Sequence, residues 1–300
     1  MSIIVKNINK LYGEQKALDD ISFEIETGDI VGFLGPNGAG KSTMMKILTA
    51  YIPASSGEAF VNNFNVSLDA LKVKQSIGYL PEHNPLYLDM YVKEFLRFTA
   101  GLFKIKNKKL AVEEVISLTG LNREQNKKIR ELSKGYRQRV GLAQAIIHKP
   151  KVLILDEPTT GLDPNQIVEI RNLIQELGKE KTIMLSTHIM QEVEAICKKV
   201  IIIDKGKIVA QDSVSHIQLQ SDDNSITIQI EFGKSIDKES LMKIENISDA
   251  KQLNDSIWLI QSHTDIREKL FNWAVINSNT VLSMQKIEKR LEDVFRELTK

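Results

Sequence analysis

Residues 35–43 read Gly35-Pro36-Asn37-Gly38-Ala39-Gly40-Lys41-Ser42-Thr43. The apolar run Ile30–Leu34 leads directly into this loop, and the apolar residues after it recur at helical spacing. Strand, glycine loop and helix in this order form the context in which such a loop binds phosphate. Glycines let backbone N–H groups approach a phosphate closely, and the positive end of the following helix adds attraction. We therefore predict a nucleoside triphosphate site whose loop residues include Gly35, Asn37, Gly38, Gly40, Lys41, Ser42 and Thr43.

Two side chains of the loop and two acids further along the chain carry the predicted chemistry. Lys41 should reach the β- and γ-phosphate oxygens, and the Ser42 hydroxyl should bind Mg²⁺. Asp156 ends an apolar run, so its carboxylate should emerge at the carboxyl edge of a sheet and hold Mg²⁺ through water. Glu157 should point elsewhere and act as general base on the attacking water. Either acid alone would be an ordinary charge at a strand end, but the pair followed by Pro158–Asp163 indicates a catalytic site.

The order of apolar runs along the chain predicts an α/β fold. Short strands are expected at Ile3–Val5 and Ile21–Ile25, before the strand that leads into the glycine loop. Later apolar runs alternate with helical stretches, which argues for a parallel sheet covered on both faces. These runs are Lys151–Asp156, Thr182–Ser186 and Val200–Ile203.

Residues 85–148 change to a mostly helical pattern. Tyr91, Phe95, Phe98 and Leu102 recur on one face of the expected helix. We interpret this stripe as the core of a helical subdomain, and a surface for a partner is the alternative.

After Ala210 the pattern loosens, and residues 211–225 are polar. We predict a boundary near residues 215–225, which divides the chain into a nucleotide-binding domain at 1–215 and a small α+β domain at 226–300. The second domain is expected to contain strands near Ile226–Phe232 and Ser256–Gln261 and helices near Lys238–Ile244, Asp265–Asn277 and Lys289–Leu298.

Charge and cysteine content narrow the functional class. The net charge of +1 creates no overall field that would favour a nucleic-acid partner, so none is expected. Cys197 is the one cysteine, which excludes an internal disulfide and suits a reducing cytosol. Apolar runs such as Val200–Ile203 are far shorter than the roughly 20 residues that span a bilayer. Any work at a membrane is therefore expected to go through a partner.

Three segments, Leu132–Gln138, Asp156–Asp163 and Ser186–His188, resemble in order and spacing the nucleotide-binding subunit of ABC transporters. The resemblance covers residues 1 to about 215. It implies a P-loop NTPase fold of the ABC type, with a mixed sheet core, an N-terminal antiparallel β subdomain and a helical subdomain. It also implies ATP and Mg²⁺ as cofactors and a head-to-tail homodimer, in which Ser133 and Gly135 of one subunit contact the γ-phosphate bound by the other.

Four further residues acquire a role only through this resemblance. Tyr12 resembles the aromatic residue that stacks on adenine, although alone it would be a packing residue. Glu82 stands where most members have a glutamine that senses Mg²⁺ and the transmembrane partner. His188 resembles the histidine that contacts the γ-phosphate, although a lone histidine at a strand end is usually structural. Asp163 matches the acid that couples the two sites across the dimer.

The C-terminal region resembles the accessory domain of ABC-2-type export ATPases, and the chain resembles subunits associated with gliding motility in Bacteroidetes. This class implies a transmembrane permease subunit as partner and a cytoplasmic location, peripheral on the inner face of the cell membrane. The alternative is a soluble ABC ATPase that acts on ribosomes or DNA, but such proteins usually carry two cassettes or a long coiled-coil insertion. A P-loop nucleotide kinase would leave Ser133–Gln138 and His188 unexplained.

Overall fold

The computed structural model describes residues 1–219, 226–287 and 291–299. These residues form two compact units, Met1–Val214 and Ser215–Leu298. The first unit contains two sheets and the second unit one, and each unit has a hydrophobic core of its own.

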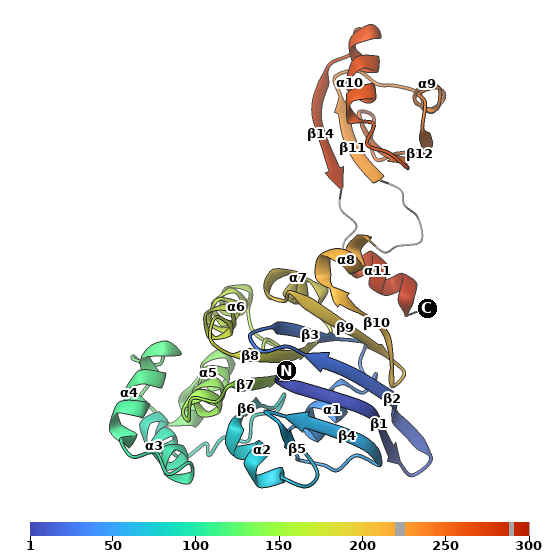
Figure 1. Cartoon of the computed structure of the whole chain (residues 1–300). Coiled ribbons are helices and arrows are strands. Elements are labelled where there is room, and N and C mark those ends of the chain that lie inside the picture. Colours follow the sequence, from blue (N-terminus) through green and yellow to red (C-terminus); the bar gives the residue numbers. More distant parts are fainter. Residues whose placement is uncertain (220–225, 288–290, 300) are drawn as a thin grey trace. The chain divides into compact units, whose positions relative to one another are not determined.

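An antiparallel sheet with the strand order β2-β1-β4-β5 forms one layer of the first unit (Figure 1). Along β1, the side chains of Ile3, Val5 and Ile8 are buried. The alternation shifts at Asn7, whose left-handed φ of 47° accompanies a bulge in the pairing with β2. The two short strands predicted here are parts of longer strands. The bounds are Ile3–Tyr12 (β1), Gln15–Ile25 (β2), Ser56–Val61 (β4) and Phe64–Asn65 (β5).

A six-stranded mixed sheet with the order β10-β9-β3-β8-β7-β6 forms the second layer. Its strands run parallel except β10, which pairs antiparallel with β9. β3, β7 and β8 are buried along their whole length, as expected for near-continuous apolar runs in a parallel sheet. The bounds are Ile30–Leu34 (β3), Ile77–Leu80 (β6), Val152–Asp156 (β7), Thr182–Thr187 (β8), Lys199–Asp204 (β9) and Lys207–Ser213 (β10).

Helix α1 (Lys41–Leu48) packs between the two sheets. Met44, Met45 and Ile47 are buried in a core to which both sheets contribute. Because the glycine loop leads into α1, this packing holds the loop at the carboxyl end of β3. Further helical segments of the first unit are α2 (Ala70–Ser76), α3 (Val92–Leu102), α4 (Lys108–Leu118), a 3₁₀ turn (Ile129–Glu131), α5 (Lys134–Ile146), α6 (Pro164–Gly178) and α7 (Met190–Ile196), while α8 (Val214–Leu219) begins at its end.

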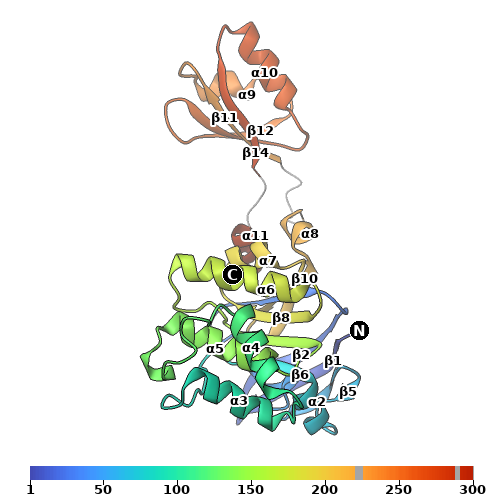
Figure 2. The same ribbon diagram turned by 90° about the vertical axis from the view of Figure 1, so that its left-hand side faces the viewer.

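Helices α3, α4 and α5 pack against one another and form the helical part of the first unit (Figures 1 and 2). The buried face of α3 includes Phe95 and Leu96. Tyr91, Phe98 and Leu102 are 47%, 44% and 66% exposed. The interpretation of the aromatic stripe as core was therefore wrong for three of its residues, because α4 and α5 meet a neighbouring face of the helix. Periodicity alone does not tell which of two adjacent apolar faces is covered.

The second unit contains an antiparallel sheet with the order β12-β13-β11-β14. Ile228, Ile230 and Phe232 alternate along β11 into a core that also includes Trp258 and Leu270. The bounds are Ile226–Phe232 (β11), Lys238–Met242 (α9), Ile247–Gln252 (β12), Ile257–Ser262 (β13), Arg267–Ile276 (α10), Val281–Ile287 (β14) and Leu291–Leu298 (α11).

Most of the elements predicted for this unit are observed, and β11 has the predicted ends. The strands β12 and β14 were not predicted. β12 is largely polar, and the apolar residues of β14 are separated by serine, glutamine and lysine. The predicted helix over 289–298 is observed from Leu291, while 289–290 lie outside the described residues. Residues 220–225, which belong to the predicted boundary, also lie outside the described residues.

Gly78 on β6 leaves no space for a side chain. A Cβ atom there would lie 2.2 Å from the carbonyl oxygen of Ala145 and 2.6 Å from Leu153 Cδ2. We expect Gly78→Ala to lower the free energy of unfolding by about 1–3 kcal/mol, because the backbone of α5 must shift. Urea unfolding followed by circular dichroism measures the change. Gly101→Ala is the matched control, since its Cβ would meet only the flexible end of Lys108, and an equal midpoint for both variants would contradict the close approach.

Candidate active site

The glycine loop between β3 and α1 has a conformation that only glycine accommodates readily. Gly38 and Gly40 have left-handed φ angles of 82° and 110°. A Cβ atom on Gly35 would lie 2.4 Å from the carbonyl oxygen of Ile203, and one on Gly40 would lie 2.6 Å from that of Ala17. The loop is therefore held against β9 and β2 by close backbone contacts. Of the other predicted loop residues, Asn37 is exposed and Thr43 is half-buried.

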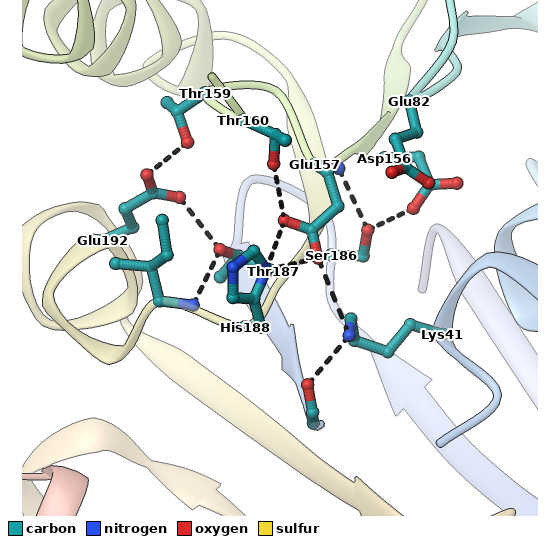
Figure 3. Close-up of polar contacts among 12 residues, drawn as sticks. Lys41, Glu82, Asp156, Glu157, Thr159, Thr160, Ser186, Thr187, His188 and Glu192 are labelled. Atoms are coloured by element: carbon teal, nitrogen blue, oxygen red, sulfur yellow. Dashed lines mark hydrogen bonds and ion pairs between the residues drawn. The ribbon is translucent and has the colours of Figure 1, made fainter. Parts of the chain in front are cut away.

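Lys41, the first residue of α1, is buried. Its ammonium group donates to the carbonyl oxygens of Gly35 at 2.8 Å and Pro36 at 3.1 Å. The same group lies 3.6 Å from Glu157 Oε1 (Figure 3). Burial lowers the pKa of Lys41, and the neighbouring Glu157 carboxylate opposes this shift. The cation therefore lies between the glycine loop and the acid that follows β7.

Asp156 ends β7 and is 2% exposed. Its Oδ1 atom accepts hydrogen bonds from the hydroxyls of Ser42, at 3.1 Å, and Ser186. Burial raises the pKa of Asp156, and these two hydrogen bonds oppose the rise. The carboxylates of Glu82 and Glu157 raise the pKa further. A buried carboxylate with hydroxyl donors and acidic neighbours is arranged to receive a cation rather than to stabilise the fold.

Glu157 occupies different surroundings although it is the next residue. Its φ of 50° is left-handed, which turns its side chain away from Asp156 (Figure 3). The carboxylate accepts a hydrogen bond from Thr160 Oγ1 at 3.1 Å and lies 2.9 Å from His188 Nδ1. The backbone N–H of Glu157 donates to the carbonyl oxygen of Ser186 at 3.1 Å, which ties this turn to β8. The two consecutive acids therefore face different partners.

The oxygens around Asp156 suit Mg²⁺. This ion prefers hydroxyl and carboxylate oxygens and usually keeps water or phosphate in its shell. Glu82 follows β6 and lines the same cavity of about 570 Å³ as Ser42 and Asp156. Within the part of the chain that the structure describes, no group of three or more His, Cys, Asp or Glu side chains could hold a metal ion. The residues therefore fit a Mg²⁺ that arrives with phosphate oxygens as further ligands.

Four further predicted site residues lie at the starts of α5 and α6 and at the end of β1. Ser133 caps α5 and accepts from a backbone N–H of the first turn at 3.4 Å, and Asp163 caps α6 through Gln166 at 2.9 Å. Gly135 lies so close to Gln166 that a Cβ atom would come within 2.4 Å of its Oε1. Tyr12 is half-exposed at the end of β1. Among the hydrogen bonds and ion pairs of the described residues, none joins these four to the loop.

Hydroxyl groups beside the two acids were missed as site residues. Most of them lie in the segments that carry the acids or beside His188, and this proximity is the signal that could have identified them. A buried glutamate four residues after His188 accepts hydrogen bonds from two of these hydroxyls (Figure 3). The residues with these hydroxyls are Thr159, Thr160, Ser186 and Thr187, and the glutamate is Glu192.

The cavity beside Ser42 extends to a half-buried histidine, His148. His148 Nε2 donates to the carbonyl oxygen of Ile77 at 2.8 Å, and the ring stacks on Phe103 with centroids 3.8 Å apart. Its Nδ1 atom is buried without a hydrogen-bond partner among the described residues. Burial lowers the pKa of His148, because the protonated ring would place an unsatisfied N–H there.

Known proteins match this chain along most of its length. The family described as "ABC transporter" matches residues 18–160. The bacitracin transport ATP-binding protein BcrA of Bacillus licheniformis is 35% identical over 305 residues, which cover 99% of this chain and 98% of the relative. The linearmycin resistance ATP-binding protein LnrL of Bacillus subtilis is 31% identical and covers 98% of this chain and 97% of its own length.

Solved structures of ATP-binding cassettes also resemble this chain. The dimeric structure of a post-hydrolysis state of the ATP-binding cassette MJ0796 bound to ADP and Pi has a TM-score of 0.65 and 25% identity. The match covers 70% of this chain and 98% of that chain. The predicted α/β fold class is confirmed. Among the helices that the structure describes, none has the length and apolar character needed to cross a bilayer.

The depressed pKa of His148 predicts a pH-dependent stability. The neutral ring stabilises the fold above the ordinary histidine pKa of 6.5, and this contribution is lost as the pH falls through the lower pKa of the folded state. His148→Gln should therefore reduce the loss of unfolding free energy between pH 7 and pH 5. Urea midpoints at several pH values measure this, with exposed His263→Gln as control. Parallel pH profiles for wild type and His148→Gln would contradict the prediction.

Proposed function

Because this chain belongs to the family of ABC transporter ATP-binding proteins, which hydrolyse ATP, we propose that it powers export through a separate transmembrane subunit. Relatives named for bacitracin transport and linearmycin resistance match it along nearly the whole chain, which supports an exporter-type system. The observation that carries the proposal is the meeting of Lys41, Asp156, Glu157 and His188 at one edge of a parallel sheet.

In the proposed site the glycine loop binds the phosphates of ATP. Backbone N–H groups of Gly38–Ser42 surround the β-phosphate, and the first turn of α1 adds its positive end. Lys41 exchanges its two backbone carbonyl partners for phosphate oxygens, because an ammonium group binds an anionic oxygen more strongly than a neutral carbonyl oxygen. Ser42, Asp156 and Glu82 are the residues that would hold Mg²⁺, which supplies neutralising charge to the phosphates.

Glu157 is the proposed general base. Its carboxylate takes a proton from a water molecule whose oxygen attacks the γ-phosphorus, while the bond to the β-phosphate oxygen breaks and leaves ADP. Thr160 and His188 hold the carboxylate on the side away from Asp156. The half-exposed His188 contacts the γ-phosphate, and Lys41 balances the negative charge. Base and metal-binding acid are thereby separated although they are consecutive residues.

Ser133, Gly135 and Asp163 are proposed to act in a head-to-tail homodimer. Ser133 is exposed at the start of α5, where backbone N–H groups and the helix dipole attract an anion. By resemblance to the family, the γ-phosphate that Ser133 and Gly135 meet is bound by a second copy of the chain, and Asp163 couples the two sites. The dimeric form of a related cassette supports the proposed homodimer. Tyr12 has a separate proposed role, which is to stack on adenine.

The transmembrane subunit is proposed to dock on the helical part of the first unit. Large apolar side chains are exposed on and before α3, and apolar groups that gather on a surface mark an interaction site. Glu82 precedes this region in the chain and lines the same cavity as Asp156, so it is proposed to respond to both. Docking places the chain on the cytoplasmic face of the cell membrane. The exposed residues are Tyr87, Leu88, Tyr91, Phe98 and Leu102.

The process in the cell that the proposed export serves is a separate prediction from the export itself. The resemblance to gliding-motility subunits stays a prediction, because the names of the two relatives refer to bacitracin transport and linearmycin resistance. The alternative of a soluble ATPase acting on ribosomes or DNA predicts copurification with ribosomes or salt-sensitive DNA binding. Copurification with a multi-spanning membrane protein supports the exporter.

Glu157→Gln should bind ATP with Mg²⁺ but hydrolyse it about a hundredfold or more slowly, because the amide cannot accept the proton. Dimers should then accumulate with ATP, as measured by light scattering after gel filtration.

Ser133→Arg in the same Glu157→Gln background should leave ATP binding to the monomer nearly intact and prevent the dimer. Near-normal turnover of Glu157→Gln would exclude this residue as the base, and equal loss of binding and dimerisation in Ser133→Arg would place the α5 loop in its own subunit's site.

Phe98→Asp tests the docking surface. Phe98 is 44% exposed, so the charge should leave the ATPase activity of the isolated chain within about twofold while copurification with the transmembrane subunit is lost. Phe271→Asp is the matched control, because Phe271 is 51% exposed on α10 of the second unit. Retained copurification of Phe98→Asp, or its loss in both variants, would contradict docking at α3.

A further inference from the structure

Glu192 on α7 is a buried carboxylate that the proposed reaction does not use. It is 1% exposed, and no ion pair of the described residues includes it. Its two oxygens accept hydrogen bonds from the hydroxyls of Thr159 and Thr187, the latter at 3.0 Å. Burying a carboxylate without a cation costs free energy, and here only hydrogen bonds from two hydroxyls compensate it. The presence of an acid here therefore calls for a functional reason.

The two threonines connect Glu192 to both halves of the proposed catalytic pair. Thr159 lies two residues after Glu157, and Thr187 directly precedes His188. Glu157 and His188 themselves are 2.9 Å apart. Side-chain hydrogen bonds and short stretches of backbone therefore form a closed ring, with Glu192 opposite the catalytic pair (Figure 3).

The hydroxyl of Thr187 is fixed on two sides. It donates to Glu192 and accepts a hydrogen bond from the backbone N–H of Ile189 at 3.1 Å. The backbone on both sides of His188 is thereby tied to one hydroxyl. The backbone N–H of Glu192 donates to the carbonyl oxygen of Ile189 at 3.1 Å, which anchors the same turn from the helix.

A carboxylate suits this position better than any neutral side chain. Ionised glutamate only accepts hydrogen bonds, so both threonine hydroxyls must donate to it and each takes one orientation. Glutamine would present an amide N–H₂ group to one of them, and that hydroxyl would have to turn. An aliphatic residue would leave both buried hydroxyls without this partner.

We propose that Glu192 is a positioning residue for ATP hydrolysis, which holds the loop of Glu157 and the loop of His188 in one relative arrangement. The inference rests on the proposed roles of Glu157 and His188. Glu192 acts through Thr159 and Thr187 and contacts none of the reacting groups. Its effect should therefore fall on the rate of the chemical step rather than on the affinity for ATP.

The first test compares the kinetics of Glu192→Gln in the full-length chain with those of wild type. We expect kcat to fall about ten- to a hundredfold, because a displacement of about 1 Å in a catalytic group has effects of that size. KM for ATP and the affinity for a fluorescent ATP analogue should stay within about threefold, since the glycine loop does not contact Glu192. Melting temperatures measured alongside separate this effect from unfolding.

The second test removes each hydroxyl without changing the shape of the side chain. Thr159→Val and Thr187→Val should each lower kcat, and Thr159→Ser and Thr187→Ser should largely restore it, because serine keeps the donor. Thr99→Val is the matched control, since Thr99 is equally buried but donates only to the carbonyl oxygen of Phe95 on α3. Its kcat should stay within about twofold of wild type.

Two results would overturn the inference. One is a kcat within twofold of wild type for Glu192→Gln and both valine variants. The other is a fall in kcat that is matched by the same loss of ATP affinity or by the loss of folded protein, with no rescue by serine. Glu157→Gln and His188→Ala are measured in the same series. Near-normal turnover in these two would contradict the proposed function itself, whereas their inactivity with fully active Glu192→Gln would contradict only the positioning role.

Discussion

The parallel pairing of β3, β8 and β7 is the constraint on which the candidate site depends. In this register Leu34 pairs with Thr187, and Asp156 pairs with Ser186. Parallel strands end at the same edge of a sheet, so segments far apart in the sequence deliver a glycine loop, two acids and a histidine to one place. Backbone hydrogen bonds that set this register therefore set the distances between the reacting groups as well.

Charges at this edge are buried at a cost to stability, which the proposed ligand binding and catalysis would explain. Lys41 has backbone carbonyls and Glu157 as neighbours, while Asp156 and Glu192 accept hydrogen bonds from hydroxyls. Buried carboxylates without a cation are costly, and the left-handed backbone of Glu157 adds strain at the same place. ATP and Mg²⁺ would bring the complementary charges, so the proposed ligand stabilises the arrangement that it uses.

The helical part of the first unit is connected to this edge by specific contacts. Gln138 Nε2 on α5 donates to the carbonyl oxygen of Pro158 at 2.9 Å, immediately after Glu157. Ser133 lies at the start of the same helix, and the exposed aromatic residues lie on and before α3, which packs against it. In the proposed dimer, a movement of the helical part would thus reach one active site through Gln138 and the opposite site through Ser133.

The sequence by itself determined the glycine loop, the strand before it and the two acids after an apolar run, because those features depend on residues adjacent in the chain. Only the tertiary structure decided that Phe95 is buried while Phe98 is exposed, since this depends on which face of α3 the neighbouring helices cover. It also decided that Glu192 meets Thr159 and Thr187. A contact between distant segments follows from the packing of whole elements, and no local pattern of residues encodes it.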